Sequence, residues 1–209
     1  MMSRVPGIRL VSGAALGAAV LLFLAGSAAA EPKYVGVKDC ARCHKKELIG
    51  DQYSAWKESQ HAKALATLQS EEALKIAEKK GLATKPHEAD ECLRCHATGH
   101  GLEPAQLHKA PLALSDGVQC ESCHGAGSDY RKKKVMADRE KSIAAGMLEP
   151  GKDEAICTGC HNQDSPTWDP AKGFDFEAGK QEIDHPIPED VKGRYLELEK
   201  AAREKAKQR

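Results

Sequence analysis

The chain has 209 residues, and its 31 Lys and Arg balance 31 Asp and Glu, so the formal net charge is zero. This balance gives no support for a nucleic-acid partner, which would favour a basic surface. Only 4% of the residues are aromatic and 30% are charged, which is little apolar material for a core of this length.

Residues 1–30 have the pattern of a secretory signal peptide. They contain two arginines, no acidic residue, an apolar run from Leu10 to Leu24, and small residues up to Ala30. An uncleaved membrane anchor is the alternative, because the apolar stretch is just long enough to span a bilayer. Its glycines and alanines dilute the hydrophobicity, so we expect cleavage after Ala30 and export to the periplasm. Contact with a membrane is expected only if the segment is not cleaved.

All eight cysteines lie in four copies of a Cys-x-x-Cys-His motif. On a helical turn the two thiols and the histidine share one face, so the thiols can form thioethers to a porphyrin while the histidine ligates its iron. A zinc site, a thioredoxin-like pair or a disulfide would explain the cysteines, but not a histidine after every pair. The motifs therefore predict four covalently attached haem c groups. The copies are Cys40-Ala-Arg-Cys43-His44, Cys92-Leu-Arg-Cys95-His96, Cys120-Glu-Ser-Cys123-His124 and Cys157-Thr-Gly-Cys160-His161.

Between the motifs the pattern predicts helices and loops. Residues 45–68 have spaced apolar side chains among Lys and Glu and are expected to be mostly helical. Ser70 is expected to cap a second helix that ends at Gly81. Residues 99–117 contain three glycines and two prolines, which indicates a loop.

The second half of the chain predicts only short elements. A helix is expected over residues 138–145, and prolines and glycines after the fourth motif exclude long elements. No strand pattern appears. The fold class expected is therefore mainly α with extensive loops and no significant β-sheet, a haem-cored cytochrome over residues 31–188. Residues 189–209 are expected to form a charged, solvated terminal helix or tail held by ion pairs.

Haem would supply the apolar bulk that the polypeptide lacks. The mature chain offers only about 45 residues for each haem, so we expect the apoprotein to be largely unfolded.

Each haem iron needs a second axial ligand or keeps an open site. Only Met136 and Met147 lie outside the signal segment, so histidine is the expected ligand for most haems. His100 follows His96 by four residues, on the proximal side of the second haem, and would have to serve another haem. The histidines outside the motifs are His61, His87, His100, His108 and His185.

The sequence resembles the cytochrome c554 family of tetrahaem electron carriers over residues 34–185. The resemblance implies that His61 ligates the third haem, that His185 ligates the fourth, and that the second haem is five-coordinate. The family also has a histidine soon after the third motif that ligates the first haem, whereas residues 125–140 contain none here. The ligands of the first and second haems therefore stay open among His87, His100 and His108. The segments that carry the resemblance are Trp56-Lys-Glu-Ser-Gln-His61, Gly99-His100-Gly101, Gly117-Val-Gln-Cys120-Glu-Ser-Cys123-His124-Gly-Ala-Gly and the late His185.

The function expected is that of a periplasmic electron-transfer carrier between redox partner proteins, with no catalytic residues. A haem enzyme that reduces a small nitrogen or oxygen species at an open haem is the first alternative. An electron-transfer subunit of a larger multihaem complex is the second. The basic run from Arg131 to Lys134 is either a docking patch or, as we expect, a solvated charge cluster.

Overall fold

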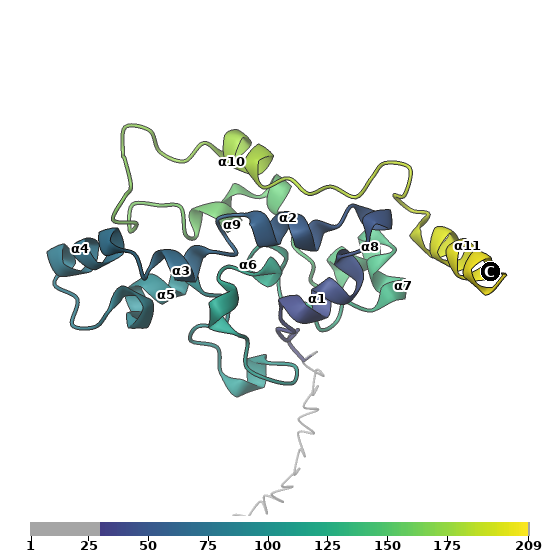
Figure 1. Cartoon of the computed structure of the whole chain (residues 1–209), viewed down its shortest axis with the longest axis horizontal. Coiled ribbons are helices and arrows are strands. Elements are labelled where there is room, and N and C mark those ends of the chain that lie inside the picture. The colour runs from purple at the N-terminus through teal and green to yellow at the C-terminus, as the bar shows by residue number, and fades with distance from the viewer. Residues whose placement is uncertain (1–29, 209) are drawn as a thin grey trace, which may run out of the picture. The chain divides into compact units, whose positions relative to one another are not determined.

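The computed structural model describes residues 30–208, so the expected signal segment lies almost entirely outside the described residues. Within the described part, no helix has the length and apolar character needed to cross a bilayer. Figure 1 shows short helices joined by long loops. Among these residues the only β-pairing is an isolated bridge between Tyr34 and Leu107, so the expectation of a mainly α fold is confirmed.

The α-helices are four to thirteen residues long. They are α1 (Val37–His44), α2 (Gln52–Glu58), α3 (Ala64–Thr67), α4 (Glu71–Lys80), α5 (Asp90–His96), α6 (Cys120–His124), α7 (Lys133–Met136), α8 (Arg139–Ala144), α9 (Glu154–Thr158), α10 (Phe176–Glu182) and α11 (Tyr195–Lys207). Single 3-10 turns lie between them at η1 (Glu47–Ile49), η2 (Pro86–Glu88), η3 (Pro104–Gln106), η4 (Leu114–Asp116) and η5 (Pro150–Lys152).

The helix expected over residues 45–68 is interrupted twice. Gly50 has a left-handed backbone with φ of 95°, which ends η1, and the Asp51 side chain then caps α2 by accepting from the Ser54 amide. At the other end of α2, the Ser59 hydroxyl donates to the Trp56 carbonyl at 2.6 Å, and α3 starts only at Ala64. Local side-chain bonds therefore replace helix continuation at both points.

The two capped helices follow their sequence signals. The Ser70 hydroxyl accepts from the Ala73 amide at 3.1 Å, and α4 ends at Gly81 with φ of 68°. Asp138 caps α8 by accepting from the Lys141 amide at 3.1 Å. Both helices are confirmed.

The apolar core is small. Leu68, Leu93 and Ala97 form a buried cluster where α3 meets α5, and Leu65 and Leu114 pack against it. Much of the remaining order comes from polar contacts between segments that are distant in the sequence, for example the indole N–H of Trp56 donating to the Val118 carbonyl at 2.7 Å.

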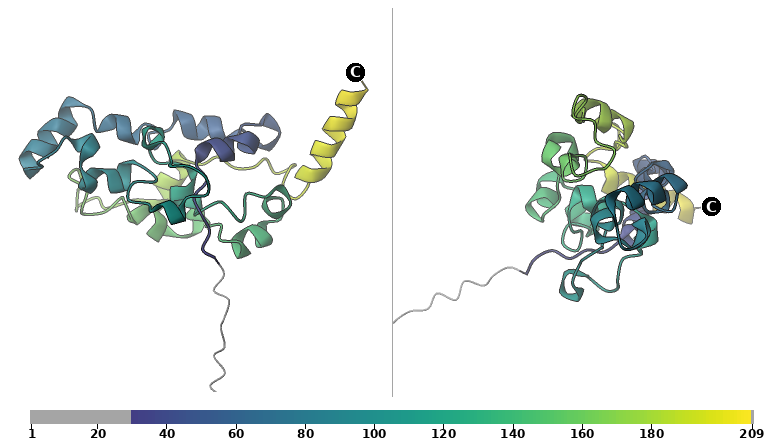
Figure 2. Two further views of the ribbon diagram at one scale, coloured as in Figure 1. Left: turned by 90° about the horizontal axis from the view of Figure 1, so that it is seen from below. Right: turned by 90° about the vertical axis from the view of Figure 1, so that its left-hand side faces the viewer.

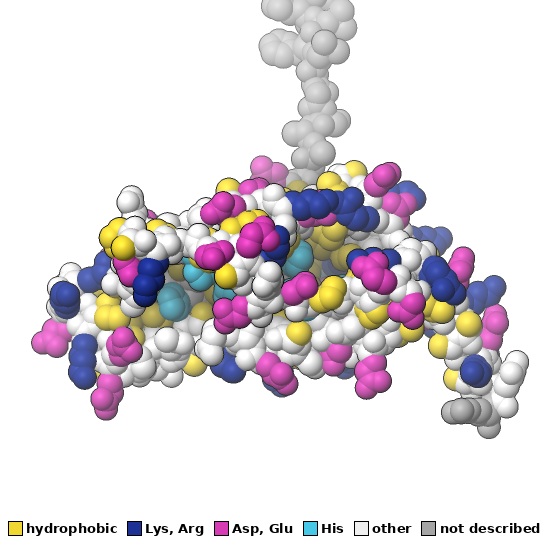
Figure 3. Space-filling view, turned by 90° about the horizontal axis from the view of Figure 1, so that it is seen from above, with side chains coloured by type: hydrophobic (Ala, Val, Ile, Leu, Met, Phe, Trp, Pro, Cys, Tyr) yellow, Lys and Arg dark blue, Asp and Glu magenta, His cyan; other side chains and the backbone are white. Residues whose placement is uncertain are grey.

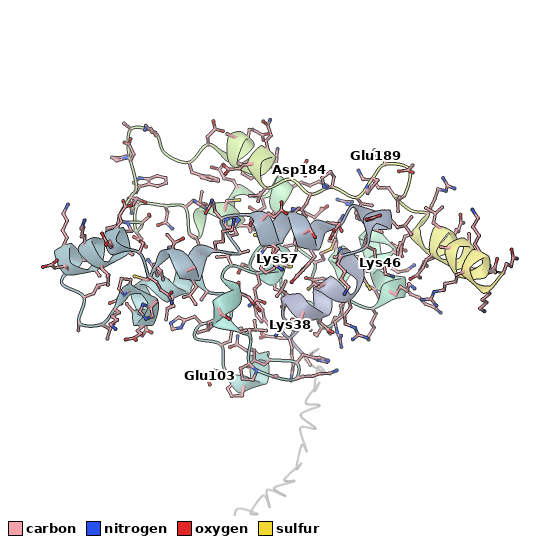
Figure 4. The ribbon with its side chains drawn as sticks, in the orientation of Figure 1. Lys38, Lys46, Lys57, Glu103, Asp184 and Glu189 are labelled. Carbon is pink, nitrogen blue, oxygen red and sulfur yellow. The ribbon has the colours of Figure 1, made fainter. Side chains whose placement is uncertain are left out.

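The terminal helix α11 is mostly exposed and forms ion pairs, which agrees with the expectation of a solvated helix held by ion pairs. Glu199 on α11 is 9% exposed, and its carboxylate pairs with Lys46 at 2.9 Å and with Lys133. Figure 4 shows Lys46 on the side of the first motif that faces α11. The Tyr195 hydroxyl also accepts from Lys46 at 3.2 Å, so Glu199 and Tyr195 together connect the C-terminal helix to the rest of the described chain. Figure 2 shows α11 projecting away from the other helices.

Candidate haem sites

Three of the four motifs close a short helix at their histidine. α1, α5 and α6 end at His44, His96 and His124. In the fourth motif the turn continues past α9, because the His161 amide donates to the Cys157 carbonyl at 2.9 Å. Each motif therefore presents both thiols and its histidine on one helical face, as the spacing predicts.

The thiols are available for attachment. All eight cysteines are free. Within the part of the chain that the structure describes, no three Cys, His, Asp or Glu side chains converge in a way that could hold a metal ion. The zinc and disulfide interpretations of the motifs therefore have no structural support.

Hydrogen bonds orient three of the motif histidines. Nδ1 of His96 donates to the Ala64 carbonyl at 2.8 Å, and Nδ1 of His44 contacts the Gln52 side-chain oxygen at 3.2 Å. Nδ1 of His124 makes a longer contact of 3.4 Å with the Leu148 carbonyl. A hydrogen bond at Nδ1 fixes the tautomer and leaves Nε2 for an iron, the arrangement expected of a metal-ligating histidine.

Two histidines outside the motifs face motif histidines. The rings of His61 and His161 have centroids 6.0 Å apart and planes at 76°, and those of His124 and His185 are 6.1 Å apart at 82°. Two imidazoles on one iron would have centroids roughly 6 Å apart, from two metal–nitrogen bonds of about 2 Å and two ring radii. Nδ1 of His185 is bonded to the Ile183 carbonyl at 2.6 Å, which leaves its Nε2 as the ligating atom. Both pairs fit a haem iron between them.

This pairing differs from the one that the family resemblance implies. His61 faces the fourth motif rather than the third, and His185 faces the third motif rather than the fourth. The backbone explains the position of His61. Its carbonyl accepts from the Val118 amide at 2.9 Å, and a Cβ at Gly117 would lie 2.6 Å from that same carbonyl. Gly117, with φ of 65° and no Cβ, therefore lets the two backbones approach each other closely. This contact helps to fix the position of His61.

The other three histidines each contact a charged side chain through Nε2. His100 lies 3.1 Å from an oxygen of Asp90, and His87 lies 3.6 Å from one of Glu88. His108 accepts from a guanidinium nitrogen of Arg131 at 2.8 Å. The structure therefore does not bring any of these three against a motif histidine as it does His61 and His185.

The position of His100 follows from the helical geometry of α5. With about 3.6 residues per turn, Asp90 and Arg94 project from the side of α5 opposite to Cys92 and Cys95. His100 lines a shallow pocket with these two residues. It therefore lies away from the face of α5 to which the second haem would be attached.

His87 is placed differently. It lies in η2, which packs against α5, and its Nδ1 is buried without a hydrogen-bond partner among the described residues. Buried ring nitrogens normally have a partner. This unsatisfied atom beside the helix of the second motif fits a group that is not part of the polypeptide.

Apolar side chains beside the motifs also fit haem. Leu148, whose carbonyl contacts His124, is 46% exposed, and Ile187, two residues after His185, is 39% exposed. Figure 3 shows histidine side chains at the floor of a hollow with hydrophobic side chains beside them. A haem macrocycle attached at the nearby motifs would cover these exposed apolar side chains. The residues around the motifs therefore fit haem.

The motifs are neighbours in a definite order. Helix α1 packs against α6, and the neighbouring thiols of Cys40 and Cys120 affect each other, so that the pKa of Cys40 is raised and that of Cys120 is lowered. Burial, together with the nearby Cys157 and Cys120 thiols, raises the pKa of Cys123 to about 11. The first motif thus lies beside the third, and the third beside the fourth.

The second motif lies beside the fourth. Burial, together with the adjacent Cys95 thiol, raises the pKa of Cys160 to about 12. Arg94 of the second motif pairs with Asp164, which follows the fourth motif, at 2.9 Å. In space the motifs therefore run first, third, fourth, second.

Cys-x-x-Cys-His turns on helices, with histidine rings paired across the gaps, define a multihaem c-type cytochrome. Residues 39–125 match the family described as cytochrome c554 and c-prime. The chain is also 30% identical over 177 residues to cytochrome c-554 from Nitrosomonas europaea, a match that covers 79% of this chain and 73% of that protein. The chain therefore belongs to the cytochrome c554 family, whose members carry covalently bound haem c and act in electron transfer. No solved structure matches it.

Proposed function

We propose that the mature protein is a periplasmic tetrahaem electron carrier with a haem at each motif. The observation that carries the proposal is the spatial order of the four motifs, each beside the next through a pair of cysteines. Haem supplies the one-electron chemistry when it is bound. The chain supplies the covalent anchors, the axial ligands and the separation between neighbouring sites.

We assign the axial ligands from the ring geometry. The motif histidines are the proximal ligands, His61 completes the fourth site and His185 completes the third. Histidine ligation on both faces favours low potentials and low-spin iron, because methionine ligation raises the potential. The first and second sites stand at the two ends of the series, where electrons enter from one redox partner and leave to another.

The proposal also covers processing and partners. Cleavage after Ala30 would give a mature chain that starts at Glu31, with the haems attached outside the cytoplasm. Partner contacts are expected to be small and transient, as is usual for electron-transfer complexes.

Intact-mass analysis and a reductive titration of the exported protein test this proposal together. The expected result is a chain that starts at Glu31, carries four haems and takes up four electrons. A mass short of four haems would contradict the assignment of one haem to each motif. A retained N-terminus would contradict the proposed cleavage.

A second candidate function is the reduction of a small nitrogen or oxygen species at an open haem. It is favoured by one observation: among residues 30–208, ring pairs are found at His124 and His161 but not at His44 or His96. Spectra with an added diatomic ligand distinguish the two functions, because a carrier with four saturated irons would not bind it.

A further inference from the structure

Glu121 is a buried carboxylate inside the third haem-attachment motif. It is 2% exposed and is among the largest fully buried side chains of the described chain. Its oxygens accept from the backbone amides of Val35 at 2.9 Å, Gly36 at 2.7 Å and Gly127 at 2.7 Å. Burial has the largest effect and raises the pKa of Glu121 above its ordinary value, whereas the three amides, which stabilise the ionised carboxylate, lower it.

No cation compensates this charge among residues 30–208, where Glu121 makes no ion pair with Lys, Arg or His. The neighbouring acid differs in this respect. Asp39, next to Cys40, pairs with Arg131 and, at 3.2 Å, with Arg42. Of the two carboxylates near the first and third motifs, Glu121 therefore carries the uncompensated negative charge.

The backbone amides that Glu121 binds come from two segments, one before the first motif and one after the third. Val35 and Gly36 lie directly before α1, the helix of the first motif, whereas Gly127 lies in the loop after the third motif. The packing at Gly127 is close, because a Cβ there would lie 3.1 Å from a Glu121 oxygen and 3.2 Å from the Val35 side chain. One side chain thus fixes α1 against α6.

The field of Glu121 reaches both attachment points. After the larger effects of the neighbouring thiol and of burial, its charge also raises the pKa of the Cys40 and Cys120 thiols, because it disfavours negative charge there. The same field favours the more positive, ferric state of an iron held beside those cysteines. A buried, uncompensated negative charge acts strongly because solvent does not screen it.

We propose that Glu121 is a positioning residue that holds the first and third motifs together and lowers the reduction potentials of the two haems attached there. The inference rests on the proposed function, because it requires a haem at each of these motifs. It assigns an effect on the reduction potential to a residue that is not an axial ligand of the iron.

The test compares the holoprotein variants Glu121→Gln and Glu91→Gln by intact mass and spectroelectrochemical titration. Glu91 precedes Cys92 of the second motif directly, but its side chain is exposed, so its removal takes the same charge from a screened position. We expect Glu121→Gln to raise the potentials of two haems, with about a tenfold change in their oxidised-to-reduced ratio, or about 59 mV. Besides burial, Glu91 also raises the pKa of Cys92, but solvent screens its exposed charge. Glu91→Gln is therefore expected to shift only the potential of the second haem, and by much less than Glu121→Gln shifts the other two.

Four attached haems with unshifted potentials in Glu121→Gln would overturn the inference while leaving the proposed function intact. A wild-type protein with fewer than four haems would instead contradict the proposed function. If Glu121→Gln takes up too little haem to be titrated, Gln119→Glu replaces it. This variant places a second carboxylate beside the Val37 amide, to which the Gln119 oxygen is bonded at 2.9 Å. Its two potentials should shift in the negative direction, and an unchanged titration would again overturn the role of Glu121.

Discussion

The ring of His61 lies opposite the ring of His161, with centroids 6.0 Å apart, although these residues are far apart in the sequence. The equivalent relationship joins His185 to His124 at 6.1 Å. The two contacts cross in the sequence. His61, the earlier of these two histidines outside the motifs, faces the fourth motif, and His185, the later one, faces the third. The pairing brings distant segments of the chain together at two motifs, and under the proposed ligand assignment it determines which two irons have histidine on both faces.

The crossed pairing predicts the outcome of a ligand deletion in a defined background. Cys157→Ser with Cys160→Ser should remove the fourth haem. Adding His61→Ala to this three-haem protein should then leave its low-spin signal in electron paramagnetic resonance unchanged, because the iron that His61 ligates is already absent.

The control for this prediction is His185→Ala in the same three-haem background. It should turn one of the remaining haems high-spin, since His185 serves the third motif. If His61→Ala is the change that produces high-spin iron and His185→Ala has no effect, the pairing is the reverse of the one assigned here.

The closed sites limit the binding of external ligands. Under the proposed assignment two haems have histidine on both faces, so carbon monoxide should bind no more than two of the four haems of the reduced protein. An optical titration measures this stoichiometry. Binding to three or four haems would show that the ring pairs do not ligate iron, and binding to none would remove the reductase function.

Gln52 is expected to tune the first haem through His44. Its side-chain oxygen contacts Nδ1 of His44 at 3.2 Å. Replacement by Glu places a carboxylate on Nδ1 and makes the imidazole a stronger donor, so one potential should become more negative. Replacement by Leu removes the hydrogen bond, so the same potential should become more positive.

The two Gln52 variants serve as controls for each other. Both disturb the packing of a buried side chain, so a general destabilisation would move the potential in the same direction in both. Shifts of equal sign in a spectroelectrochemical titration would therefore contradict the role of this hydrogen bond.

Glu199 is expected to hold the C-terminal helix in place. Its carboxylate, 11% exposed, pairs with Lys46 and Lys133 and accepts from the Tyr195 hydroxyl at 3.1 Å. Glu199→Gln should weaken these contacts by about 1–3 kcal/mol, because the lysines lose their buried partner. Hydrogen exchange in α11 should rise by about tenfold or more, while the haem spectra stay unchanged.

Glu197→Gln is the matched control for this helix. Glu197 lies one half-turn away on α11 and is exposed, so its replacement should not change hydrogen exchange. Equal exchange rates in the two variants would show that the Glu199 contacts do not attach the helix.

The basic run from Arg131 to Lys134 shows how tertiary contacts change the interpretation of a charge cluster. In sequence it indicates either a docking patch or a solvated cluster. In the structure Arg131 bonds Asp39 and His108, and Lys133 bonds Glu199, so half of the run forms internal ion pairs. Arg131 and Lys133 are therefore neither part of a free docking patch nor simply solvated charges.

The sequence by itself determined the features that depend on neighbouring residues. The attachment motifs are local, because positions i, i+3 and i+4 share a helical face whatever surrounds them. The cap of α4 at Ser70 and its end at Gly81 are equally local, and both were predicted. The mainly α fold followed from the same short-range patterns and from the lack of strand periodicity.

Only the tertiary structure decided which histidine meets which motif, and where buried charges lie. His61 reaches His161 because Gly117 lets two backbones approach, and Glu121 is buried because amides from two distant segments bind it. The His61–His161 contact and the bonds from Val35 and Gly36 to Glu121 join residues tens of positions apart, and no periodicity in the sequence encodes them. Their energy depends on burial and on the geometry of several segments at once, so they are determined only when the chain has folded.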